Sequence, residues 1–393
     1  MRGEVQVKAI VGGRIITVTG PVIDNGVILV DDNGVIREIG KHGEVKIPDD
    51  TEVIEAYGKT ITPGFIDAHS HLGLIPEGLD WEYSDVNDYY SPITAHLRAI
   101  DALDPYDKGF NDAVAGGVTT IYTGPGSANV IGGIGLVMKT YGESLDEMVL
   151  NPEAAVKMAL GPKRQREVKS KYPYPTSRMG TVALLRQWLL RAREYLNGRT
   201  DIDKIDPEDR AILEVLARVL KREMLAKIHL STSPDEIYAI VRIIKEFNLR
   251  ATIDHVFGGQ LLADMLAREN IQVVYGPPMV AKIASFFRYV DDKAPVVMYR
   301  SGVNVSIMSD HPVIPEKHLR LLAAVTVKNG LTLNEALDLI TINPARQLGL
   351  EDKLGSIEPG KDADLVIASD HPVKPTSTIE MVLVKGRVAY NIK

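Results

Sequence analysis

Two histidines separated by one residue follow a short apolar run near the start of the chain. The run Phe65–Ala68 is preceded by Pro63-Gly64 and followed by His69-Ser70-His71. If the run is a strand, side chains two positions apart share a face, so both imidazoles point the same way from its carboxyl end. Two converging imidazoles supply half of a transition-metal site. A pair of polar residues at a strand end is the simpler alternative.

Further candidate ligands lie within or directly after later apolar runs. They are Lys157 in Ala155–Leu160, His229 after Leu225–Ile228, His255 after Ala251–Asp254 and Asp310 after Val303–Met308. Any one of these histidines alone is more often a hydrogen-bonded polar residue at a strand end. If the runs are neighbouring parallel strands, their carboxyl ends meet at one rim, and the joint placement then predicts a metal site.

The residue types in this set suit hydrolysis. Neutral imidazoles with a carboxylate bind Zn, Fe, Mn or Ni and leave positions open for water. Such an ion makes water a nucleophile near neutral pH and polarises a carbonyl. Asp310 is the candidate that passes the proton of water to a leaving nitrogen, and a turn residue before His311-Pro312 is its alternative reading. His255 is expected to bind metal or to polarise the substrate. The chain has no cysteine, which excludes thiolate ligands.

The elements that must position these residues alternate between strands and helices from about 63 to 350. This rhythm predicts a parallel sheet, and eight strands with helices between them predict a (β/α)8 TIM barrel. The expected strands are Phe65–Ala68, Val118–Tyr122, Leu136–Lys139, Ala155–Leu160, Leu225–Ile228, Ala251–Asp254, Val273–Tyr275 and Val303–Met308. The expected helices include Val182–Leu196, Pro207–Arg222, Asp235–Phe247, Gln260–Glu269, Leu319–Lys328 and Leu333–Ile340.

Both ends of the chain read as β structure. The expected strands are Val5–Ile10, Arg14–Val18, Val27–Val30, Val35–Ile39, Ala363–Ala368 and Met381–Val384. We expect one small β-sandwich domain built from residues 1–62 plus 351–393, with residues 63–350 forming the barrel. Two separate β caps are the alternative, but each would be small for a core of its own.

Composition narrows the choice of partners. A net charge of -7 in 393 residues argues against nucleic acid. No run of about 18 apolar residues is present, so no membrane span is expected. The start of the chain carries charge without an apolar segment, which predicts a cytoplasmic protein without a signal peptide. We expect a small-molecule substrate and a homo-oligomer.

Motifs across nearly the whole chain resemble the amidohydrolase superfamily, most closely its imidazolonepropionase-related branch. They are P-G-F-I-D-A-H-S-H at 63–71, S-D-H-P at 309–312, N-P-A-R at 343–346 and G-S-I-E-P-G-K-D-A-D-L-V at 355–366. The resemblance implies a (β/α)8 barrel, one or two divalent metals, with Zn expected first, and hydrolysis of a C–N bond in an amide, cyclic amide or dipeptide. By the same resemblance His69, His71, His229, His255 and Asp310 match metal and catalytic positions.

Lys157 has a special place in this resemblance. In members with two metals a lysine of the fourth strand is carboxylated and bridges the ions, and V-K-M-A-L-G at 156–161 resembles that pattern. A lysine that pairs with a carboxylate is the alternative. Close relatives often carry a second His and an Arg soon after the strand-5 histidine, whereas Ser231-Thr232-Ser233 stands here, so substrate-binding residues are not predicted. A ring deaminase with the same ligands and a catalytically silent scaffold remain alternative functions.

Overall fold

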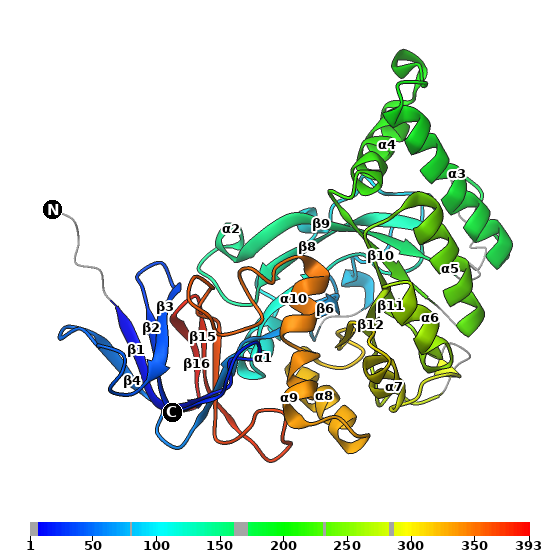
Figure 1. Ribbon diagram of the computed structural model, residues 1–393. Coiled ribbons are helices and arrows are strands. Elements are labelled where there is room, and N and C mark those ends of the chain that lie inside the picture. The colour runs from blue at the N-terminus through cyan, green and yellow to red at the C-terminus, as the bar shows by residue number, and fades with distance from the viewer. Residues whose placement is uncertain (1–6, 79–80, 161–171, 231–232, 283–286) are drawn as a thin grey trace.

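The computed structural model describes residues 7–78, 81–160, 172–230, 233–282 and 287–393. These residues form two sheets of eight strands each (Figure 1). The first sheet lies at the end of the molecule that holds the C-terminus, and the second lies beside it with most of the helices around it. The fold is therefore mixed α/β with two sheets.

The first sheet takes strands from both ends of the chain. Its strands are β1 Lys8–Ile15, β2 Ile23–Val30, β3 Ile36–Lys41, β4 Glu52–Glu55, β5 Thr60–Pro63, β14 Leu365–Ala368, β15 Ile379–Val384 and β16 Arg387–Asn391. Their order is β16-β15-β14-β5-β1-β2-β3, and β4 pairs with β1. Apolar side chains from both termini, among them Ile10, Ile28, Ile61, Leu365 and Leu383, share one buried cluster. Burial of this shared surface holds the two ends of the chain together.

The prediction of separate strands at Val5–Ile10 and Arg14–Val18 is wrong for the described residues. Residues 8–15 form one strand, β1, which continues through Gly12 and Gly13, and residues 16–18 lie outside it. Its register with β2 shifts at those glycines, and Gly12 has a φ of +86°. A pair of glycines admits a bulge as readily as a turn, and the apolar pattern does not distinguish the two. Val5 and Gln6 lie outside the described residues.

The second sheet contains the strands on which the candidate ligands lie. They are β6 Phe65–Ser70, β7 Val118–Thr123, β8 Ile131–Lys139, β9 Val149–Ala159, β10 Leu225–His229, β11 Ala251–His255, β12 Gln272–Tyr275 and β13 Val305–Ile307. Their spatial order follows the chain order from β6 to β13. All eight predicted strands are present, but β8 begins at Ile131 and β9 at Val149, whereas Leu136 and Ala155 were the expected starts.

One strand of the second sheet runs against the predicted direction. β8 is antiparallel to both β7 and β9, whereas the other pairs are parallel. Residues 124–130 form the whole connection between β7 and β8. A parallel crossover needs a dozen or more residues, so this short connection imposes an antiparallel pair.

Helices cover the second sheet from outside (Figure 1). The α-helices are α1 Gly109–Ala115, α2 Leu145–Met148, α3 Arg178–Leu196, α4 Pro207–Leu220, α5 Pro234–Phe247, α6 Ala263–Arg268, α7 Ala294–Arg300, α8 Leu319–Lys328, α9 Leu333–Asp338 and α10 Ile342–Leu348. The expected helix Gln260–Glu269 is instead a 3-10 turn, η4 Gly259–Leu262, followed by α6. None of the helices in the described ranges has both the length and the apolar character needed to cross a bilayer.

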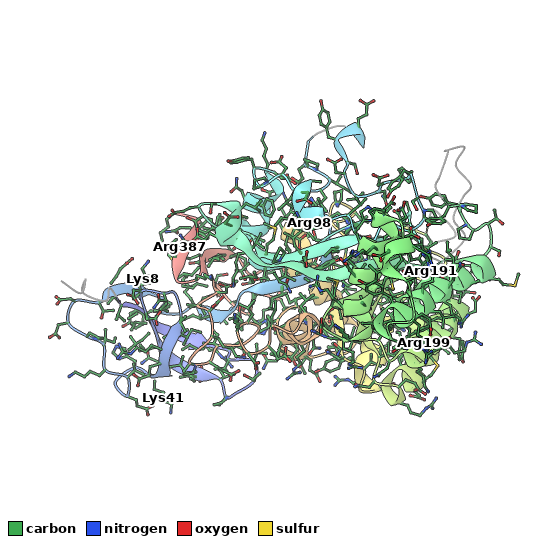
Figure 2. The ribbon with its side chains drawn as sticks, turned by 90° about the horizontal axis from the view of Figure 1, so that it is seen from above. Lys8, Lys41, Arg98, Arg191, Arg199 and Arg387 are labelled. Atoms are coloured by element: carbon green, nitrogen blue, oxygen red, sulfur yellow. The ribbon has the colours of Figure 1, made fainter. Side chains whose placement is uncertain are left out.

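The molecule is elongated when it is viewed from above (Figure 2). Lys8 and Lys41 mark the end formed by the first sheet, and Arg191 and Arg199 mark the opposite end near α3. Most of the candidate ligands lie at or shortly after the carboxyl ends of β6, β10, β11 and β13. The sheet thus brings residues that lie far apart in the sequence, from 69 to 310, to one rim.

Candidate metal centre

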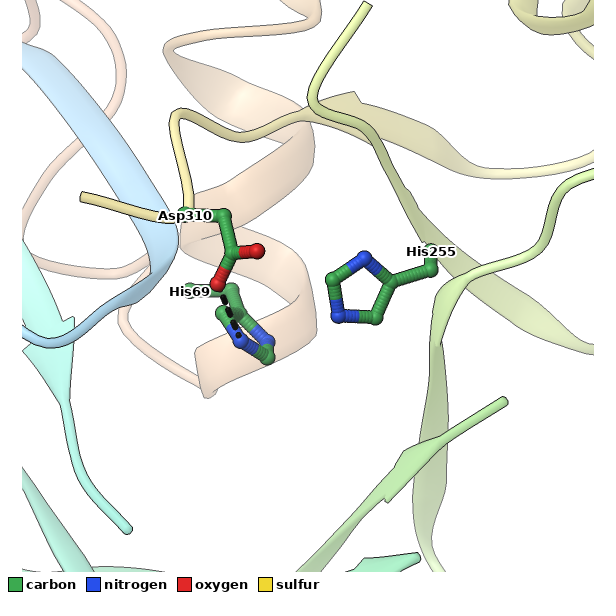
Figure 3. A group of neighbouring side chains, drawn as sticks. All are labelled: His69, His255 and Asp310. Carbon is green, nitrogen blue, oxygen red and sulfur yellow. Dashed lines mark ion pairs between the residues drawn. The ribbon is translucent and has the colours of Figure 1, made fainter. Parts of the chain in front are cut away.

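Three side chains from distant parts of the sequence converge at the carboxyl ends of the second sheet. His69 comes from β6, His255 from β11 and Asp310 from the segment after β13 (Figure 3). One ligand atom from each lies within 4.8 Å of the other two. This spacing is compatible with a single cation held between them.

The two histidines of the H-x-H motif both face Asp310. Nε2 of His69 lies 3.3 Å from Oδ1 of Asp310, and Nε2 of His71 lies 3.4 Å from the same oxygen. Their ring centroids are 5.4 Å apart. The strand alternation expected from the sequence therefore directs both imidazoles to the same side.

Hydrogen bonds fix which ring nitrogen of each histidine faces the cluster. Nδ1 of His71 lies 2.7 Å from the carbonyl oxygen of Gly124, and Nδ1 of His255 lies 2.8 Å from that of Gly276. A carbonyl only accepts, so each Nδ1 carries the hydrogen and donates it. The Nε2 lone pairs are then available for a ligand, which is the form that metal binding requires.

Burial keeps these rings in the neutral form. It lowers the pKa of His71 below its ordinary value and lowers the pKa of His255 to about 3. His229 closes β10 beside His255, with ring centroids 4.2 Å apart. The structure thus brings a fourth imidazole to the same rim.

Asp310 is an anion surrounded by imidazoles. Burial alone would raise the pKa of Asp310, but interactions with the neighbouring histidine rings lower it well below its usual range. The backbone at Asp310 has a φ of +53°, and its amide donates to the carbonyl oxygen of His69 at 3.3 Å. The left-handed turn and this bond join the end of β13 to the end of β6.

Lys157 lies directly behind the cluster. Its Nζ is 3.3 Å from Nε2 of His69, and the residue is 1% exposed. Burial lowers the pKa of this amine to about 8. All six residues proposed from the sequence are therefore neighbours at this rim.

Sequence reasoning missed a set of buried groups beneath the ligands. Asp254 receives a hydrogen bond from Nδ1 of His69 at 2.7 Å and pairs with Lys227 at 3.2 Å. Asp67 accepts from the amides of His69 at 2.9 Å and Ser309 at 2.7 Å. The signals were present, because Asp67 lies within the first motif, Asp254 precedes His255, and Lys227 shares a strand face with His229.

The glycine-rich run after β7 contributes backbone to the centre through Gly124. The adjoining Pro125 and Asn129 line a cavity of about 320 Å³ together with His96 and Arg98 from the connection after β6. Ser231 and Thr232, which follow His229, lie outside the described residues.

Comparison with known proteins agrees with the motifs. The model of the amidohydrolase family matches residues 60–389. The amidohydrolase tasK of Hapsidospora irregularis is 29% identical over 400 residues, which cover 93% of this chain but 40% of that protein. The chain therefore spans less than half the length of this relative.

Two further proteins match along most of their length. The imidazolonepropionase of Geobacillus kaustophilus is 26% identical over 390 residues, covering 88% of this chain and 84% of that protein. The crystal structure of an amidohydrolase from Thermotoga maritima is 33% identical, superposes with a TM-score of 0.89 and covers 98% of this chain and 99% of that one. The resemblance stated from the motifs is confirmed.

Proposed function

Because the chain belongs to the amidohydrolase family, we propose that it is a metal-dependent hydrolase of a C–N bond in a small molecule. The observation that carries the proposal is the convergence of His69, His255 and Asp310 within 4.8 Å. Buried neutral imidazoles beside a carboxylate form a donor set of the kind that binds Zn, and Fe, Mn or Ni are the alternatives.

The residues that would hold a divalent ion are His69, His71, His229, His255 and Asp310. Lys157 would join them as a carboxylated bridge if two ions are bound. The fit rests on the hydrogen bonds that Nδ1 makes in His69, His71 and His255. These bonds leave the Nε2 lone pair of each ring available to coordinate a metal ion. A bound ion supplies Lewis acidity toward water and toward a carbonyl oxygen.

The side chains of this chain then bind, orient and move protons. Oδ1 of Asp310 lies beside the imidazoles of His69 and His71, so we assign proton transfer to its Oδ2 atom. This oxygen accepts a proton from the attacking water and donates it to the leaving nitrogen. His255, whose Nε2 presents a lone pair, would help to hold the ion. Burial of the ligands excludes bulk water and strengthens each of these interactions.

The relatives and the family motifs support a choice of substrate class. We propose a cyclic amide, a simple amide or a dipeptide, with cyclic amides first because the imidazolonepropionase relative matches along most of both chains. The proposed scaffold is a variant (β/α)8 barrel spanning residues 63–350, with a small β-sandwich formed by residues 1–62 and 351–393. The bonds that join the ends of β6 and β13 support closure of the second sheet.

Elemental analysis and a substrate panel test this function. The purified full-length chain is analysed for Zn, Fe, Mn and Ni and assayed against cyclic amides, acyl amides, dipeptides and amino-substituted rings. We expect bound metal and amide hydrolysis, and we expect Asp310→Asn to reduce turnover by about 10² to 10⁴. Asp352→Asn, at an exposed position, is the matched control.

Two results would replace the proposal with another. Ammonia release from amino-substituted rings without amide hydrolysis would identify a ring deaminase. Absence of both metal and turnover, in a folded protein, would identify a silent scaffold.

A further inference from the structure

A line of buried polar side chains runs from the interior of the second sheet to the candidate centre. It consists of Lys227 on β10, Asp254 on β11 and His69 on β6, and each is at most 1% exposed. Nζ of Lys227 lies 3.2 Å from Oδ1 of Asp254, and Oδ2 of Asp254 lies 2.7 Å from Nδ1 of His69. The hydroxyl of Thr252 donates to Oδ1 of the same carboxylate at 2.9 Å.

The strand geometry explains why two consecutive residues reach one histidine. Successive side chains of a regular strand point to opposite faces. His255 breaks this rule because its φ is +72°, a left-handed conformation that is unusual for a residue other than glycine. Asp254 contacts Nδ1 of His69 from one side, and the ring of His255 lies 5.1 Å from the ring of His69.

This arrangement determines which ring nitrogen of His69 carries the hydrogen. An ionised carboxylate only accepts, so Nδ1 must carry the hydrogen and Nε2 must present its lone pair to the cluster. His71 and His255 are oriented by backbone carbonyls, whereas His69 is oriented by a full negative charge. A carboxylate behind a ligand imidazole makes that imidazole a stronger donor and holds its orientation.

Lys227 stabilises the ionised form of the buried Asp254 side chain. A buried carboxylate without a cation is strongly destabilised. The lysine lies over the ring of Tyr122 at 4.8 Å and also donates to Thr252 at 3.3 Å. Burial of an ion pair is often no more stabilising than burial of an apolar pair of the same volume, so stability alone is a weak explanation for this one.

We propose that Asp254 and Lys227 are positioning residues that fix the Nδ1–H form of His69 and raise its affinity for a divalent ion. This inference rests on the proposed function and deepens it. Neither residue has a ligand role of its own, because each acts through the imidazole.

The test measures metal affinity directly. Metal-free full-length protein and its Asp254→Asn variant are titrated with Zn²⁺ in competition with a chelator. Asparagine keeps the size of the side chain and can still accept from Nδ1, but it lacks the charge. We expect the dissociation constant for Zn²⁺ to rise by about 10- to 100-fold, with the fold retained. Ser306→Ala, which removes a buried hydroxyl bonded to Gln347 away from the centre, is the control and is expected to leave the constant unchanged.

A spectroscopic measurement separates positioning from a general loss of structure. In the Co²⁺-loaded protein the Nδ1 hydrogen of a ligand histidine gives a hyperfine-shifted exchangeable proton signal. One such signal should shift or exchange faster with solvent in Asp254→Asn and remain unchanged in Ser306→Ala. If Asp254→Asn does not fold, Thr252→Val removes one donor to the same carboxylate and should weaken Zn²⁺ binding several-fold.

The outcomes distinguish this inference from the proposed function. Equal Zn²⁺ affinity and an unchanged set of exchangeable signals in a folded variant would overturn the role of Asp254 alone. A wild-type chain that binds no divalent ion would instead overturn the proposed function.

Discussion

The amine of Lys157 offers a test of the number of metal ions at the scale of one residue. It lies 3.3 Å from Nε2 of His69 inside the sheet. A protonated amine at this place would repel a cation, whereas a carboxylated amine would bind one. We expect Lys157→Met, which fills similar space without a charge, to lower the bound metal by about half in a protein that stays folded.

Elemental analysis of the variant and of wild type measures this effect. Lys353→Met, at an exposed position, should keep the full metal content. An unchanged content in Lys157→Met would show that one ion suffices and that the lysine does not bridge.

Single-residue conformations were the part of the site that the sequence did not reveal. The ligand types and their strand-end positions followed from periodicity, because alternation alone places His69 and His71 on one face. The left-handed backbones of His255 and Asp310 did not follow, since neither residue type demands a positive φ. The left-handed conformation of His255 lets Asp254 and His255 both face His69, whereas regular alternation places consecutive residues on opposite faces, so Asp254 was missed.

The end of helix α9 allows a test at the scale of one element. The helix begins with a capping box formed by Thr332 and Glu335 and ends at Asp338, which is half-buried beside Tyr299. Burial raises the pKa of Asp338 from 3.8 to about 6. The folded chain therefore holds this proton more tightly than the unfolded chain, and the resulting stabilisation is complete below about pH 4 and is lost as the pH rises through 6.

Asp338→Asn removes this dependence. Relative to wild type, we expect the variant to become more stable as the pH rises from 4 to 8, by about 1 to 2 kcal/mol after allowance for solvent screening. Urea unfolding at both pH values measures the change. A difference in free energy of unfolding that stays constant across this range would show that Asp338 is ionised equally in both states.

The elements themselves were largely predictable, and their directions were less so. The helices α4, α5 and α8 match their predicted ranges closely, because apolar spacing and the Ser233-Pro234 start are local signals, whereas α3 begins four residues before its predicted start. The reversal of β8 depends on the seven-residue connection 124–130. Its glycines were interpreted as a loop and not as the turn of a hairpin. Strands β4 and β5 were missed because their sequences, E-V-I-E and T-I-T-P, contain no long apolar run and the second ends in proline.

At the scale of the whole molecule, the buried ammonium group of one lysine joins the two sheets. Lys139 on β8 is 1% exposed, and its Nζ lies 2.7 Å from Oδ2 of Asp364 and 3.0 Å from Oδ2 of Asp362. Both aspartates precede β14 of the first sheet. The same Asp364 accepts from the amide of Lys385 at 3.0 Å. A motif that resembles the family signature thus places two of its three carboxylates on a lysine of the other sheet.

Lys139→Met should therefore weaken the whole molecule. It leaves the buried carboxylate of Asp364 and the partly buried carboxylate of Asp362 without their cation, and we expect a loss of about 3 to 5 kcal/mol in the free energy of unfolding. Urea unfolding followed by tryptophan fluorescence measures the loss.

Lys59→Met is the matched control, because it removes a partly exposed pair with Glu380 within the first sheet and should cost about 1 kcal/mol or less. Adding Asp364→Asn to Lys139→Met should restore part of the loss, since one of the unpaired charges is then gone. A loss in Lys139→Met no larger than that of Lys59→Met would show that the sheets are held together by their apolar contacts and not by this ion pair.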